Sequence, residues 1–186
     1  MPSDDGCLCG GCRRKPFPFV RAWAAFAYGG SLTQAIVRFK HGGSRHLARP
    51  LGLFLEPVIE HAVRAGADVV CPVPLHPRRL RQRGYNQVLE LLRSARPRLG
   101  KNGADLLPDA MARIVDTPSL GHHSPAHRRD LVAKAFAVVR PKRIVGKNAL
   151  LVDDVMTTGA TLAEGARTLL SAGARSVTVA VLARAL

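Results

Sequence analysis

Apolar residues are grouped along the chain in short runs that alternate with segments of helical periodicity. Residues 19–28, 68–72, 110–115, 136–139 and 177–182 are short, mostly apolar runs that predict strands. Apolar residues at helical spacing predict helices from 31 to 40, from 45 to 65, from 86 to 94 and from 162 to about 172. Pro50 and Pro57 predict an interruption or kink in the second of these helices. Strands and helices that alternate in this way predict an α/β domain.

The most informative stretch is ALLVDDVMTTGAT, residues 149–161. Its four opening apolar residues, without polar alternation, predict a strand buried on both faces, as in a parallel sheet. We expect this strand to stop at Asp153 and Asp154, where a turn with hydroxyls and a glycine leads into the helix from Leu162. Ligands bind at such a junction in open α/β sheets. Backbone N–H groups and Thr hydroxyls at a helix N-terminus favour a phosphate.

The two acids constrain the ligand, because they would repel a bare phosphate. A phosphorylated sugar satisfies both groups, with its phosphate on the turn and its hydroxyls donating to the carboxylates. The alternative is that Asp153 and Asp154 only end a strand and cap a helix, as isolated acid pairs commonly do. The full spacing DDxxTTGxT favours the ligand site.

A second polar stretch, PVPLHPRRLRQRGYNQ at residues 72–87, follows the strand at 68–72. It holds four arginines and a histidine within eight positions, together with prolines that stiffen it. Guanidinium forks suit pyrophosphate oxygens, so this loop predicts a trap for a multiply charged anion. The alternative is an Arg-rich helix start that faces solvent. The residues that we assign to the trap are Pro74, Arg78, Arg79, Arg81, Arg83 and Gly84.

Residues 72–87 and 149–161 together resemble the ComF/GntX family of competence-associated, type I phosphoribosyltransferase-like proteins. The resemblance covers the chain from about Phe17 onward. It implies the type I phosphoribosyltransferase fold, with a central, mainly parallel sheet flanked by helices and a small N-terminal hood. It also implies 5-phosphoribosyl-1-pyrophosphate (PRPP) as the ligand, with Asp153 and Asp154 as catalytic acids on its ribose. The residues implied to bind its 5-phosphate are Met156, Thr157, Thr158, Gly159, Ala160 and Thr161.

The first half of the polar segment at 116–136 is expected to be a mobile loop, and a short helix is expected to begin at Ser124-Pro125. The segment resembles the lid of the family. Relatives tend to carry Gln where this chain has Leu120, Asn where it has Leu131, and Gly near Lys134. These departures bear on lid contacts and on turnover, and they leave the PRPP motif untouched. The lid positions that match the family are Thr117, Arg128 and Arg129.

Cys7, Cys9 and Cys12 form CxCxxC in a glycine-containing segment, residues 1–16, which we separate from the phosphoribosyltransferase-like domain at 17–186. Family members usually begin with a four-cysteine zinc knuckle, of which only the later half is present here. A four-thiolate zinc site needs two CxxC pairs, and Cys71 lies in an apolar strand. A partial Zn²⁺ site and a remnant that binds no metal therefore both stay open.

The chain of 186 residues carries 28 Lys and Arg against 13 Asp and Glu, a net charge of +15. This excess indicates either a solvated basic surface or polyanionic partners. Aromatic residues make up only 5%, so salt-sensitive contact with a nucleic-acid backbone is more plausible than extensive base stacking. No apolar run is long enough to span a bilayer, and the N-terminus is unlike a signal peptide. We therefore expect a cytoplasmic protein without membrane insertion.

The sequence thus predicts a phosphoribosyltransferase that moves the phosphoribosyl group of PRPP to an unidentified acceptor and releases pyrophosphate. Such a reaction needs stabilisation of an oxocarbenium-like centre and no protein nucleophile. Mg²⁺ is expected with PRPP, held largely by substrate and water oxygens. Two alternatives stay open. One is a PRPP-binding regulator without turnover, and the other is an accessory of DNA uptake that binds single-stranded DNA or competence and DNA-processing proteins.

Overall fold

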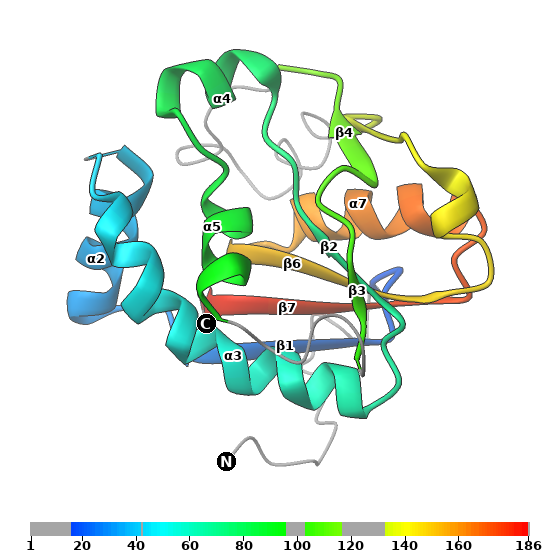
Figure 1. Ribbon diagram of the computed structural model, residues 1–186, viewed down its shortest axis with the longest axis horizontal. Coiled ribbons are helices and arrows are strands. Elements are labelled where there is room, and N and C mark those ends of the chain that lie inside the picture. The colour runs from blue at the N-terminus through cyan, green and yellow to red at the C-terminus, as the bar shows by residue number, and fades with distance from the viewer. Residues whose placement is uncertain (1–15, 42, 96–102, 117–132, 186) are drawn as a thin grey trace.

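The computed structural model describes residues 16–41, 43–95, 103–116 and 133–185 (Figure 1). Its main sheet has five strands in the order β1-β7-β6-β2-β3, and all neighbours are parallel. Two more strands, β4 (Met111–Arg113) and β5 (Phe136–Val138), form a separate antiparallel pair. The expected α/β architecture with a central, mainly parallel sheet is confirmed. The strands of the main sheet are β1 (Arg21–Ala27), β2 (Val69–Pro72), β3 (Asp105–Leu106), β6 (Asn148–Met156) and β7 (Ser176–Arg184).

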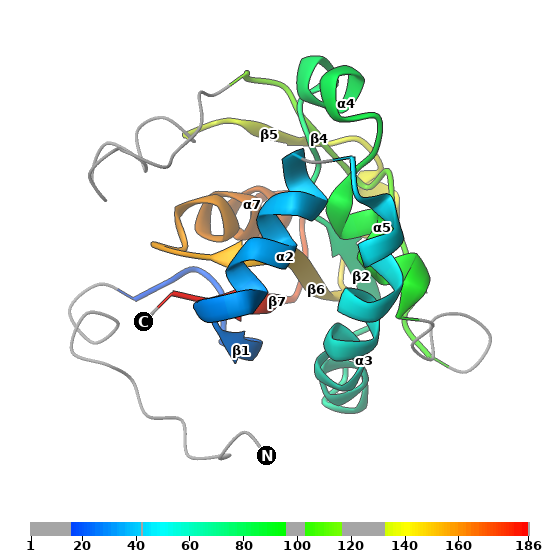
Figure 2. The same cartoon turned by 90° about the vertical axis from the view of Figure 1, so that its left-hand side faces the viewer.

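Helices cover both faces of the main sheet (Figures 1 and 2). One face carries α2 (Gly30–His41), α3 (Ala48–Arg64) and α5 (Gln87–Ser94), and the other carries α7 (Ala160–Ser171). A short helix, α4 (Pro77–Arg83), and the 3₁₀ turns Arg45–Leu47 and Pro141–Arg143 complete the described elements. Within the described ranges, no helix has both the length and the apolar character needed to cross a bilayer.

The unbroken apolar run of β6 supplies both hydrophobic cores. Leu151 packs toward α7, whereas Leu150 and Val152 pack toward α2, α3 and α5. All three side chains are fully buried. Successive side chains of a strand point to opposite faces, so a strand covered on both faces needs apolar residues at every position. This confirms the prediction of a doubly covered strand at 149–152.

Most of the predicted elements are present with shifted ends. The helix expected over 45–65 begins as a 3₁₀ turn and continues as α3, with Pro57 inside it. The two-residue strand β3 was not expected, because it forms only by pairing with β2. The N-terminal part contributes β1 as an edge strand of the main sheet, followed by α2. Among the described residues, the segment expected to supply the hood therefore contributes an edge strand and one helix, α2.

Gly52 is the contact point between α3 and α5. A Cβ there would lie 2.8 Å from the carbonyl oxygen of Leu91 and 2.8 Å from the Cβ of Ser94. Alanine has a higher helix propensity than glycine, but overpacking at this contact is the larger effect. We therefore expect Gly52→Ala to lower the free energy of unfolding by about 1–3 kcal/mol. Denaturant unfolding measures this. Gly29→Ala is the matched control, since a Cβ at Gly29 meets nothing within 4 Å; equal stability of the two variants would contradict the packing argument.

Candidate functional site

Asp153 and Asp154 lie inside β6, which continues to Met156. The prediction that the strand stops at these acids is wrong. The reason is the neighbouring strand β7, which stays in register with β6 from Asp153 to Met156. Pairing with a buried neighbour thus overrides the low strand propensity of aspartate. Both side chains are buried, with only 9% and 3% of their surface exposed.

A short turn, residues 157–159, joins β6 to α7. Gly159 ends the turn with a φ of +74°, a left-handed conformation that favours glycine. The first turn of α7 carries no acidic residue that would occupy its N–H groups. Of the predicted phosphate-binding residues, Thr157 and Thr161 line a cavity, and Thr158 is half-buried beside them. The side chains of Met156 and Ala160 are packed in the core.

This cavity, of about 440 Å³, lies at the carboxyl ends of β2 and β6. It brings together segments that are far apart in the sequence. The two acids come from β6 and the threonines from the turn and α7, while Pro74 comes from the segment after β2. Basic side chains from α2, α4 and β4 complete its walls. They are Lys40, Arg79, Arg83 and Arg113.

Residues 77–83 form helix α4, so the expectation of a loop is wrong, and the alternative of an Arg-rich helix at this position is confirmed. The Nδ1 atom of His76 accepts a hydrogen bond from the N–H of Arg78 at the start of this helix, and Gly84 ends it at a φ of +82°. These caps account for the helix. Arg79 and Arg83, one helical turn apart, line the cavity with the acids. The remaining residues predicted for the anion trap, Arg78, Arg81 and Gly84, are exposed and do not line it.

Lys40 contacts the acids directly, and it was not among the site residues predicted from the sequence. Its Nζ lies 2.8 Å from Oδ1 of Asp154. Burial lowers the pKa of Lys40, but the carboxylates of Asp154 and Asp153 outweigh this effect and raise it above its ordinary value. Lys40 is therefore charged at neutral pH. The sequence shows only a basic residue at the end of a helix, and the packing of α2 over the sheet brings it to the site.

Arg113 is the second basic residue that the sequence did not assign. It belongs to β4, is 8% exposed, and its guanidinium lies 5.6 Å from the centroid of the Phe136 ring on β5. Burial, followed by the charge of Arg79, lowers its pKa. No motif surrounds Arg113 in the sequence, so its place follows only from the pairing of β4 with β5.

The two carboxylates have different environments. Oδ1 of Asp153 accepts a hydrogen bond from the backbone N–H of Asp154 at 2.8 Å. Burial, and then the charge of Asp154, raise the pKa of Asp153 to about 7. Oδ2 of Asp154 is buried and has no hydrogen-bond partner among the described residues. A buried acceptor without a donor is costly, so a ligand hydroxyl or cation that reached this oxygen would bind favourably.

Asp153 also predicts a pH dependence of stability. Its folded pKa of about 7 exceeds the ordinary 3.8, so between these values the folded chain keeps a proton that the unfolded chain loses. The free energy of unfolding should therefore fall as pH rises from about 4 to about 7, by at most about 1.4 kcal/mol per pH unit. We expect Asp153→Asn to remove this pH dependence. Denaturant unfolding of both proteins at several pH values measures the difference, and a pH-independent difference would contradict this assignment.

Several predicted site residues lie outside the described residues. The lid positions Thr117, Leu120, Arg128, Arg129 and Leu131 are among them, as are Cys7, Cys9 and Cys12. Lys134 is described, and its φ of +56° is the only positive value at a non-glycine position among the described residues. The N–H of Lys134 donates to Oε1 of Glu164 at 2.6 Å. A left-handed backbone favours glycine, which gives a physical reason for the expectation that relatives carry Gly near Lys134.

Cys71 lies in β2 and is 1% exposed, as its apolar surroundings in the sequence indicated. Burial raises the pKa of its thiol to about 12, which disfavours a free thiolate at this position. Among the described ranges, no three His, Cys, Asp or Glu side chains are grouped as metal ligands.

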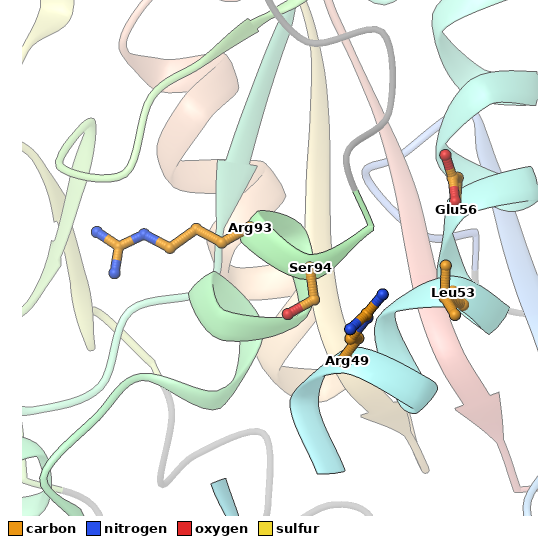
Figure 3. A pocket seen from close by; sticks show the side chains of 5 residues that line it. All are labelled: Arg49, Leu53, Glu56, Arg93 and Ser94. Carbon is orange, nitrogen blue, oxygen red and sulfur yellow. The ribbon is translucent and has the colours of Figure 1, made fainter. Parts of the chain in front are cut away.

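Another hollow, of about 580 Å³, lies between α3 and α5 (Figure 3). Figure 3 shows the side chain of Arg93 directed away from the other lining residues. This hollow has no pair of acids and no hydroxyl-bearing turn, so it lacks groups that would recognise a phosphorylated sugar. The cavity at β6 is the better candidate. The residues that line the hollow are Arg49, Leu53, Glu56, Arg93 and Ser94.

Comparison with known proteins agrees with this choice. Residues 114–186, which include β6, the turn and α7, match the model of the phosphoribosyl transferase domain. The chain is 34% identical over 182 residues to the DNA utilization protein YhgH of Escherichia coli O157:H7, with 96% of this chain and 78% of that protein covered. It is 32% identical to the Salmonella typhi protein of the same name, with the same coverage. It is 29% identical over 195 residues to competence protein F of Haemophilus influenzae, with 95% and 78% covered.

Proposed function

Since the chain belongs to the ComF/GntX family and has the type I phosphoribosyltransferase fold, we propose that it binds PRPP and transfers its phosphoribosyl group to an acceptor. One observation carries this proposal. A pair of buried acids, a hydroxyl-bearing turn at a helix N-terminus and four basic side chains line the same cavity. These three groups match the ribose, the 5-phosphate and the pyrophosphate of PRPP.

Each part of the cavity has a proposed role. The turn and the N-terminal N–H groups of α7 bind the 5-phosphate, with hydroxyls from Thr157 and Thr161. Asp153 and Asp154 accept hydrogen bonds from the ribose hydroxyls, which would satisfy the buried Oδ2 of Asp154. The basic residues bind the pyrophosphate. They are Lys40, Arg79, Arg83 and Arg113.

In the proposed reaction, the bond between C1′ of the ribose and the pyrophosphate oxygen breaks, and its electron pair leaves with the pyrophosphate. The acceptor forms the new bond at C1′ and gives up a proton. The buried carboxylates stabilise the positive charge that develops on the ribose, and the basic residues stabilise the leaving anion.

Mg²⁺ suits this cavity. Carboxylate oxygens are hard donors that this ion prefers, and the buried Oδ2 of Asp154 has no donor among the described residues. Bound with PRPP, the ion would neutralise part of the charge of the leaving pyrophosphate. The ion would be held largely by substrate and water oxygens, as is usual for Mg²⁺.

A second candidate function is that of a DNA-binding accessory of DNA uptake, with or without transferase turnover. It is favoured by the net charge of +15 and by the names of the relatives, which refer to DNA utilization and to competence. The affinity for single-stranded DNA would then fall steeply as salt rises. A flat salt response would count against this candidate.

Calorimetric titration with PRPP and Mg²⁺ tests the proposal directly, and we expect a saturable heat of binding. Absence of binding would refute both the transferase and the PRPP-binding regulator. If PRPP binds, a screen of bases, amines and nucleotides for pyrophosphate release separates the two. Release with one acceptor identifies the enzyme and its substrate.

A further inference from the structure

A second, smaller cavity adjoins the one at β6, on the side of α2 and α4. It has a volume of about 390 Å³. Lys40, Arg79 and Arg83 line both cavities, as does His41, so the two spaces meet along these side chains. Gly43, Gln82 and Tyr85 line the second cavity and not the first.

The two cavities differ in charge. The first contains Asp153 and Asp154, whereas no carboxylate is among the described residues that line the second. Three cationic side chains and the amide of Gln82 line it, together with His41, Gly43 and Tyr85. Arg79 also lies 3.8 Å from Asp116, and Arg83 donates to Gln87, so both guanidinium groups are held in place by residues outside this cavity. Such a space is complementary to a compact anion with several acceptor oxygens.

Neighbouring groups limit what the second cavity can bind. The hydroxyl of Tyr85 donates to the carbonyl of Phe39, so it is already engaged. Burial, and then the charges of Arg83 and Lys40, lower the pKa of His41, which leaves its imidazole neutral at neutral pH. Lys40 lines the second cavity, and its Nζ lies 2.8 Å from the carboxylate of Asp154. An anion in the second cavity would thus be adjacent to the acids of the first.

We propose that the second cavity is a phosphate-binding subsite beside the pyrophosphate site, with which it shares Lys40, Arg79 and Arg83. It would hold a phosphate of the molecule that receives the phosphoribosyl group. This role rests on the proposed function, because the cavity meets the PRPP cavity at Lys40, beside the acids that bind the ribose. A nucleoside monophosphate and a DNA strand both carry such a phosphate. In either case the phosphate would anchor the acceptor while the rest of it reaches the reacting carbon.

The variant that tests this subsite is Gln82→Glu, which places a negative charge in the second cavity and leaves the lining of the first unchanged. Arg38→Gln is the matched control. It also lowers the net charge by one, and Arg38 is exposed on α2 two positions from Lys40 without lining either cavity.

The probes are adenosine monophosphate and 5′-phosphorylated oligo(dT), titrated with and without saturating PRPP and Mg²⁺. We expect a probe to bind the wild-type protein in both conditions. Gln82→Glu should weaken this binding by about tenfold or more, with little change in PRPP affinity, and Arg38→Gln should not. Binding of the mononucleotide would indicate a small acceptor, and binding of oligo(dT) alone would indicate DNA.

Three results would overturn the subsite. They are no binding of either probe, displacement of the probes by PRPP, and equal weakening by the two variants. A different result would contradict the proposed transferase function without contradicting the subsite. If PRPP does not bind the wild-type protein but a probe still binds and responds to Gln82→Glu, the subsite stands and the transferase does not.

Discussion

Replacing Asp153 and Asp154 together by asparagine is expected to weaken the binding of PRPP with Mg²⁺ by at least about 100-fold. Both acids are buried in the cavity, and the double variant removes both carboxyl groups. A hydrogen bond to a charged group contributes about 1.5–3 kcal/mol, and every 1.4 kcal/mol is a factor of about ten in affinity. Two such bonds to the ribose hydroxyls therefore account for a loss of this size. Titration calorimetry of the two proteins measures it.

The matched control is Asp109→Asn, which also removes a negative charge. Asp109 is exposed, is paired with Arg140 and does not line the cavity. The PRPP affinity of this variant should stay within about threefold of the wild-type value. Thermal unfolding without ligand distinguishes loss of the site from loss of the fold. Unchanged PRPP binding by the folded double variant would show that the acids have no contact with the donor.

Replacing Arg79 and Arg83 together by alanine is expected to weaken PRPP binding by about 100-fold and to leave ribose 5-phosphate binding nearly unchanged. Both guanidinium groups line the cavity. Since each charge-assisted bond to the pyrophosphate contributes about 1.5–3 kcal/mol, losing two removes a large part of the affinity for PRPP. Ribose 5-phosphate has no pyrophosphate, so it should not respond. Parallel titrations with the two ligands separate these effects.

The other two arginines of the same helix provide the control. Arg78 and Arg81 are exposed outside the cavity, and Arg78 lies 3.5 Å from Asp116. Arg78→Ala/Arg81→Ala removes the same total charge, and we expect an effect on PRPP of about threefold or less. Equal losses in the two double variants would mean that α4 acts through its overall charge and not through the side chains that face the acids.

Helix α4 explains why the four arginines are not equivalent. Within a helix, residues four positions apart share a face, and here that face carries Arg79 and Arg83. In an irregular loop all four could have converged on one anion. The prolines of this stretch indicate a stiff loop, whereas His76 and Gly84 cap a helix, which is the alternative that the sequence left open.

Local patterns in the sequence were sufficient for the strand–turn–helix unit at residues 149–161. An apolar run without alternation, a hydroxyl- and glycine-containing turn and an apolar helical face each depend on residues close in the chain. The parallel sheet follows from the same patterns, because only a strand covered on both faces is apolar at every position. These features allowed the fold, and the ligand class that we propose, to be predicted.

The tertiary structure alone decided which distant side chains surround the two acids. Lys40 and Arg113 come from α2 and β4, at sequence distances that no local motif spans, and both line the cavity. It also decided that β6 continues through the acids, since β7 pairs with them. The turn-and-acid motif of residues 149–161 is local and could be predicted from spacing. The cations that surround it, and the second cavity beside them, follow from how helices pack over the sheet, and the sequence does not encode that packing in any single stretch.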